Sequence, residues 1–122
     1  MALTWEDALL HASNLEATGD SQAAAAAYQQ LADAGCPEAI DALAQAYLDG
    51  TGVEQSSEHA VALFEKAIGL GYTPSMYNLG AIYYSGHYGP DRDLETGVKL
   101  LERAAEGGDS LALAFLASIG RE

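Results

Sequence analysis

The sequence predicts an all-α fold, a solenoid of antiparallel helix pairs with about seven helices. The first observation is a repeat in which a leucine follows a glycine after eight residues and a tyrosine follows after four more, as in Gly35, Leu43 and Tyr47. The glycine recurs at Gly71 and Gly108, which are 36 and then 37 residues further on. The second observation is that no segment alternates at a period of two for long, so no sheet is expected. The glycine spacing of 36 and 37 residues is typical of stacked units that bury their apolar faces against their neighbours.

The first helix pair is expected in residues 1–35. Thr4 precedes two acidic residues, and a hydroxyl in this position accepts a free N–H while the acids favour the positive helix end. A helical period of alanine and leucine then continues to a turn at Gly19. A second helix is expected from about residue 23 to Gly35.

Two further pairs are expected, in residues 36–72 and 73–108. Each opens at a proline, Pro37 or Pro74, whose missing N–H costs nothing at the first helical position. The first helices are predicted at 37–49 and 74–85, the return helices at 57–70 and 93–106, and a terminal half-repeat at 109–122 contains a last helix at 109–119. We therefore predict one repeat domain over residues 1–122.

Glycine-rich loops follow both first helices. Gly50 and Gly52 lie in the first loop and Gly86 in the second, and glycines at a helix end predict a left-handed cap and turn. A phosphate loop is not indicated, because no Lys-Ser or Lys-Thr follows and no strand precedes. The second loop is longer at His87 and Tyr88, which are either a second contact site or a variable loop without consequence.

The charge of the chain restricts its partners. Eighteen acidic residues and five basic ones give a formal charge of −13. This charge disfavours nucleic acid and anionic membranes, and it favours a basic partner, although solubility alone also explains it. A single cysteine, no stretch long enough to span a bilayer and no signal peptide predict a cytoplasmic protein.

No catalytic, cofactor or metal site is predicted. His11, His59 and His87 are widely separated and lack other ligands at metal-binding spacing. Cys36 precedes a helix start, but no histidine lies at a spacing that suggests a nucleophile pair, and no Gly-x-Ser-x-Gly elbow is present. We expect a protein that is not an enzyme.

Two stretches carry a family resemblance. Residues 79–86 read Leu-Gly-Ala-Ile-Tyr-Tyr-Ser-Gly, and residues 43–53 follow the same pattern with Ala44 in place of the glycine. The return helices end in Lys-Ala or Arg-Ala followed by glycine four residues later. The chain thus resembles the tetratricopeptide superfamily, specifically its Sel-one-like branch, and the first pair is similar to an ordinary tetratricopeptide unit. The resemblance implies a right-handed superhelix whose first helices line a concave face.

The resemblance also implies which side chains lie on that face. By its positions the partner-binding residues are Glu6, Leu9, Ser13, Glu16, Glu38, Asp41, Gln45, Leu48, Asp49, Tyr77, Ala81 and Tyr84, with Ala114 and Ser118 on the last helix. Ala44 and Gly80 are expected where the paired helices cross. Tyr47 and Tyr83 are expected to fill the space beside the return helix, Tyr47 against Phe64.

Three functional hypotheses follow. The first is a non-catalytic adaptor whose acidic and tyrosine-lined face binds a basic, partly apolar protein segment. The second, from a different class, is a stoichiometric inhibitor of a basic effector, like an immunity or antitoxin protein. The third, an enzyme with a site in the groove, has no supporting motif. The alternative for the binding surface itself is that these side chains are only solvated. Self-association is also expected through the apolar terminal helix, which contains Leu111, Leu113, Phe115 and Leu116.

Overall fold

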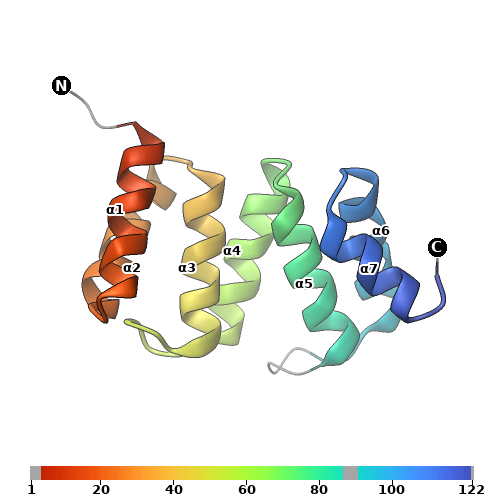
Figure 1. Ribbon diagram of the computed structural model, residues 1–122. Coiled ribbons are helices and arrows are strands. Elements are labelled where there is room, and N and C mark those ends of the chain that lie inside the picture. Colours follow the sequence, from red (N-terminus) through yellow and green to blue (C-terminus); the bar gives the residue numbers. More distant parts are fainter. Residues whose placement is uncertain (1–3, 87–90, 122) are drawn as a thin grey trace. The chain divides into compact units, whose positions relative to one another are not determined.

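The computed structural model describes residues 4–86 and 91–121, and in these residues the chain forms helices joined by turns (Figure 1). Within the described residues there are seven helices and no strand, which confirms the predicted all-α repeat class. The helices are α1 (Trp5–Ala17), α2 (Ser21–Asp33), α3 (Pro37–Asp49), α4 (Ser57–Gly69), α5 (Thr73–Ser85), α6 (Leu94–Glu106) and α7 (Ser110–Ser118).

The chain divides into two compact units, Met1–Ala67 and Ile68–Glu122. In the first unit, α2 packs against both α1 and α3. In the second unit, α6 packs against both α5 and α7. Each unit therefore has a middle helix that contacts two others.

Side-chain caps begin several of the helices. The Thr4 hydroxyl accepts the Asp7 N–H at 3.1 Å, as predicted for the start of α1. The predicted start of α2 at residue 23 was too late, because the Asp20 carboxylate accepts the Ala23 N–H and helical geometry begins at Ser21. Helix α5 also begins earlier than predicted, at Thr73, one residue before Pro74. Proline is tolerated in the first turn because the N–H that it lacks would have no partner within the helix there.

The loops after α3 and α5 close in the same way. Gly50 and Gly86 adopt the predicted left-handed conformation, with φ of 70° and 65°. In the first loop the Gln55 side-chain amide donates to the Leu48 carbonyl at 2.8 Å, and in the second the Arg92 Nε donates to the Tyr84 carbonyl at 3.0 Å. Both bonds attach the loop to the last turn of the helix before it.

A glycine lies where α5 and α6 cross, as predicted for Gly80. A Cβ on Gly80 would lie 3.0 Å from the Gly97 carbonyl oxygen, and one on Gly97 would lie 2.8 Å from the Gly80 carbonyl oxygen. The backbones of α5 and α6 therefore approach each other directly. In the first unit Ala44 is fully buried.

Tyr47 lies beside the return helix α4, as predicted, and its ring partner there is one that was not predicted. Its ring stacks on His59 of α4, with centroids 4.5 Å apart and planes 9° apart, and it is only half-buried. Phe64, which was expected to be its partner, is fully buried in the core of the first unit. Because His59 is exposed and Tyr47 is half-buried, the stacked pair lies at the edge of the core.

Candidate functional site

The predicted α1 residues follow one stripe of that helix, at spacings of three and four residues. Glu6, Ser13 and Glu16 are exposed, and Leu9 is half-buried. Burial raises the pKa of the Tyr28 phenol on α2, and the negative charge of Glu16 raises it further. Glu16 therefore places its charge near α2, while Glu6 and Ser13 face solvent.

The α3 residues are less uniform. Glu38 and Asp49 are exposed, and Asp41 and Gln45 are half-buried. The assignment of Leu48 to the binding face is wrong, because its side chain is 4% exposed and belongs to the core. Leu48 lies four residues after the fully buried Ala44, so it continues the apolar stripe of the helix.

The α5 residues meet an aromatic side chain from α7. The Phe115 ring makes edge-to-face contacts with Tyr84, at 5.3 Å between centroids, and with Tyr77, at 6.3 Å. The Arg92 guanidinium lies 5.9 Å from the centre of the Tyr84 ring. Tyr77, Tyr84 and Phe115 form what we call the aromatic cluster, and all three are half-buried, as is the predicted Ala81. Two of the three cluster residues were predicted as binding residues.

Phe115 was missed as a member of this surface. Phe115 belongs to the apolar terminal helix, where the family resemblance assigns only Ala114 and Ser118, both exposed in the structure, to the binding face. By register Phe115 corresponds to Asn78, 37 residues earlier, which is not a predicted binding position. The repeat spacing therefore carries no signal for Phe115, and its contacts with two tyrosines are found only in the structure.

A recess of about 500 Å³ lies beside the aromatic cluster in the second unit. Tyr84 forms part of its wall, and Lys99 and Glu95 at its edge form an ion pair at 3.0 Å. The remaining lining residues are Leu94, Val98, Glu102, Ile119 and Arg121. The recess thus combines an aromatic and aliphatic wall with charges of both signs.

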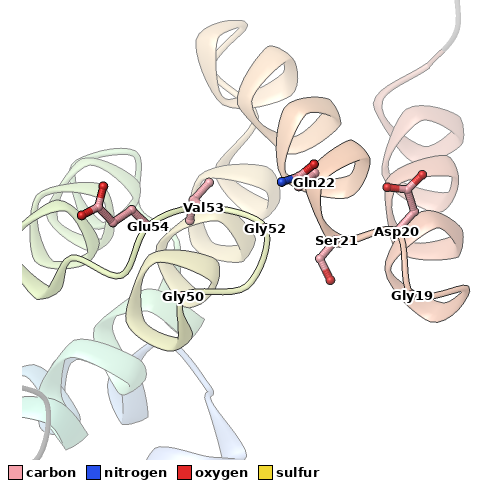
Figure 2. Close-up of a pocket in the computed structure, with 8 residues that line it drawn as sticks. All are labelled: Gly19, Asp20, Ser21, Gln22, Gly50, Gly52, Val53 and Glu54. Atoms are coloured by element: carbon pink, nitrogen blue, oxygen red, sulfur yellow. The ribbon is translucent and has the colours of Figure 1, made fainter.

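A second recess, of about 540 Å³, lies in the first unit between the α1–α2 turn and the loop after α3 (Figure 2). Its lining residues are Gly19, Asp20, Ser21, Gln22, Gly50, Gly52, Val53 and Glu54. Figure 2 shows the loop at Gly52 running past Ser21. A Cβ on Gly52 would lie 2.1 Å from the Ser21 carbonyl oxygen, so only glycine fits at this contact.

Catalytic chemistry finds no support in these recesses. Over the described residues, no three His, Cys, Asp or Glu side chains gather closely enough to hold a metal ion. Cys36 is fully buried and its thiol donates to the Glu38 carboxylate at 3.3 Å. Burial raises the pKa of the Cys36 thiol, which keeps it protonated and opposes its use as a nucleophile.

Two observations concern the remaining sequence predictions. None of the described helices has the length and apolar character needed to cross a bilayer. The loop residues His87 and Tyr88 lie outside the described residues, so their predicted role stays a prediction.

The helix pairs, their glycine caps and their small-residue crossings define a helical-repeat protein. The family model for the Sel1 repeat matches residues 37–72 and 73–109, and the chain belongs to this family, which confirms the resemblance. Repeats of this family generally act as protein-interaction scaffolds without catalysis.

Similar proteins were found by sequence and by structure. Chitin synthase regulatory factor 3 of Schizosaccharomyces pombe is 32% identical over 79 residues, which cover 65% of this chain and 8% of that protein. The Sel1 repeat protein of Oxalobacter formigenes has a TM-score of 0.70 at 28% identity, over 84% of this chain and 43% of that one.

A third similar protein is c5321, a protective antigen of uropathogenic Escherichia coli with an SLR fold. It has a TM-score of 0.71 at 27% identity, over 82% of this chain and 22% of its own. The chain spans less than half the length of each of these three proteins.

Proposed function

We propose that this chain is a non-catalytic interaction module that binds a basic, partly apolar protein segment. The acidic side chains of α1 and α3 in the first unit would contact Lys or Arg. The aromatic cluster of the second unit would contact apolar side chains of a partner. We also propose that it acts in the cytoplasm as an adaptor.

The observation that carries the proposal is the position of Tyr84. Its ring contacts Phe115 and also lines the 500 Å³ recess, where Val98 and Glu102 lie as well. Tyrosine gives a large, rigid contact area at a low entropic cost, and it is enriched where binding energy is concentrated. A Lys or Arg stem would pack along the aromatic and aliphatic wall while its charge meets a carboxylate.

The exposed carboxylates of α1 and α3 are the reason to expect a basic partner. Glu6, Glu16, Glu38 and Asp49 are all exposed, in a chain with a net charge of −13. Such a field accelerates encounter with a basic partner more than it raises affinity. Binding should therefore weaken as salt is added.

The test uses peptides selected on the protein from a random display library, with affinities measured by calorimetry. Selected peptides should be enriched in Lys or Arg together with apolar residues. Asp49→Lys, Asp41→Lys and Tyr84→Ala should each weaken binding about tenfold or more, since truncating an interface anchor costs more than about 1 kcal/mol. The helical melt of Asp49→Lys, followed by circular dichroism, should stay close to wild type, whereas Tyr84→Ala should melt somewhat earlier because it loses the contact with Phe115.

Two matched controls separate position from chemistry. Glu65→Lys makes the same change of charge at an exposed position of α4, and Leu70→Ala truncates an exposed apolar side chain outside the cluster. Both should bind like wild type. If the surface variants also bind like wild type, the proposed surfaces are wrong.

The inhibitor alternative rests on the same acidic charge and predicts a different affinity. An inhibitor binds a single basic effector at about nanomolar concentration or below and blocks its activity, whereas an adaptor binds more weakly. Stoichiometric loss of the partner's activity would favour the inhibitor.

A further inference from the structure

The helix α7 exposes positions that are buried in the equivalent helices before it. Leu113 lies 37 residues after Met76 and 73 after Ile40, so the three residues hold the same repeat position. Ile40 is fully buried and Met76 is 7% exposed, but Leu113 is 54% exposed. Met76 belongs to a cluster with residues of α6 and α7, whereas Leu113 is absent from that cluster. This face has the pattern of one that another helix covers.

The shape of the face suits a closely packed helix. At 100° per residue, Ser110, Ala114 and Ala117 lie along its middle, and Leu111 and Leu113 lie at its two edges. All five are exposed. Small residues in the middle let a second backbone approach, and the leucines then pack on either side of it.

The charges at the two ends of α7 are opposite. Asp109 lies at the N-terminus, where its carboxylate accepts the Ala112 N–H at 2.9 Å, and Arg121 lies just beyond the C-terminus. The residues between them, 110–120, carry no charge. An antiparallel copy of the same helix would therefore place each Asp109 beside the Arg121 of the other copy.

We propose that this face binds a second copy of the chain, with the two α7 helices packed antiparallel about a two-fold axis near Ala114. Such an interface is self-complementary, because each copy supplies the leucine edges and the opposite charge that the other needs. It also places the contact on an uncharged segment of a chain whose net charge is −13, which limits repulsion between the copies. A basic partner would find no carboxylate between Ser110 and Gly120.

The experiment measures the mass of the full chain by sedimentation equilibrium over a range of concentrations and salt. We expect a mass that rises toward twice the 12.7 kDa of one chain. Salt from about 0.01 M to about 1 M shortens the Debye length from about 30 to about 3 Å and screens both the repulsion between the copies and the two Asp109–Arg121 pairs. Association should strengthen, because a net charge of −13 on each copy outweighs two exposed ion pairs. A chain that stays monomeric throughout overturns the proposal.

Variants test the location of the interface. Leu113→Glu should raise the dissociation constant roughly a hundredfold or more, because it places two like charges against each other across the axis. Leu70→Glu adds the same charge at a side chain of the same 54% exposure and should associate like wild type. A dimer that tolerates Leu113→Glu, or that Leu70→Glu disrupts equally, contradicts the assignment.

Cross-linking tests the geometry of the crossing. Ala114→Cys should form a disulfide between copies under mild oxidation, because a bond requires Cβ atoms within about 4.5 Å of each other. Ala62→Cys, at an exposed position of α4, should not, and the native Cys36 is fully buried. Failure of Ala114→Cys to cross-link in a dimeric sample overturns the two-fold arrangement.

Arg121 and helix α7 serve both proposals, but the two proposals respond differently to salt and to substitution. Association through α7 strengthens with salt, whereas binding of a basic peptide weakens with it. Leu113→Glu should leave peptide binding unchanged, and Asp49→Lys should leave association through α7 intact.

Discussion

The two Sel1 repeats close their loops alike and pack their helices differently. Both have a left-handed glycine after the first helix and a side-chain donor that reaches back to the helix end, Gln55 in one and Arg92 in the other. At the crossing, Ala60 of the first repeat corresponds to Gly97 of the second, 37 residues on. The two repeats therefore share the backbone conformation at the loop glycine and a hydrogen-bond donor in the loop, whereas the residue at the crossing differs.

The difference at the crossing extends to the core behind it. Phe64 in the first repeat corresponds to Leu101 in the second, and both are fully buried. The first repeat combines alanine methyl groups with a large aromatic ring, whereas the second combines glycine with a smaller leucine. A smaller core side chain suits backbones in direct contact, because protein interiors tolerate few voids. Crossing and core residues thus vary together.

The largest expected effect tests the loop of the first repeat. Gly52→Ala should lower the free energy of unfolding by about 2–5 kcal/mol, since the added Cβ meets the Ser21 carbonyl and a non-glycine residue takes a φ of 78°. Urea denaturation measures it. Gly71 has a φ of 82°, and a Cβ added there would meet nothing within 4 Å. Gly71→Ala therefore isolates the cost of a left-handed backbone at a non-glycine residue, about 1–2 kcal/mol. Equal losses for the two variants would show that the contact with Ser21 is absent.

The next effect tests the crossing of the second repeat. Gly97→Ala should destabilise by about 1–3 kcal/mol, because its Cβ would lie 2.8 Å from the Gly80 carbonyl oxygen and the Tyr84 nitrogen. Gly69→Ala, where the Cβ meets nothing within 4 Å, should be neutral or slightly stabilising in the same urea melts. A neutral Gly97→Ala would mean that the second repeat accepts the alanine packing of the first.

A smaller effect tests the donor that both loops share. Gln55→Ala and Arg92→Ala should each cost about 0.5–1.5 kcal/mol, the net value of one hydrogen bond, by thermal or urea denaturation. Arg92→Gln supplies the amide of the first repeat and should restore part of the loss. If it is no better than Arg92→Ala, the two closures are not equivalent.

The smallest effect is a pH dependence of stability that distinguishes the N-caps of the two return helices, α4 and α6. Hydrogen bonds from the Thr96 hydroxyl and N–H lower the pKa of Asp93 below its usual 3.8, whereas Ser56 caps α4 without titrating in this range. Because the folded pKa is lowered, the contribution of Asp93 is present above its ordinary pKa. It is lost as pH falls through the folded value. Asp93→Ser should therefore lose less stability on acidification than wild type in urea melts below pH 3.8.

Local rules explain what the sequence predicted well. The Thr4 cap, the left-handed Gly50 and Gly86 and the crossing at Gly80 each follow from residue type and spacing along one helix or turn. Helix starts were displaced by a residue or two where a cap was interpreted as a turn, as at Asp20.

The errors have two sources, one within a helix and one between helices. Leu48 has the spacing of a surface residue in the repeat pattern, but within α3 it extends the buried stripe of Ala44. The stacking of Tyr47 on His59, and the place of Phe115 between two tyrosines, depend on side chains that come from different helices. Spacing along the chain does not determine which rings meet, so these partners required the structure.

The most direct test of the interaction proposal is NMR mapping of the ¹⁵N-labelled chain titrated with a selected basic peptide. We predict shift changes concentrated in the first helices of the repeats, at Asp41, Asp49, Tyr77 and Tyr84, and at Phe115 of α7. Changes confined to the exposed sides of α2, α4 and α6, with none at these residues, would contradict it.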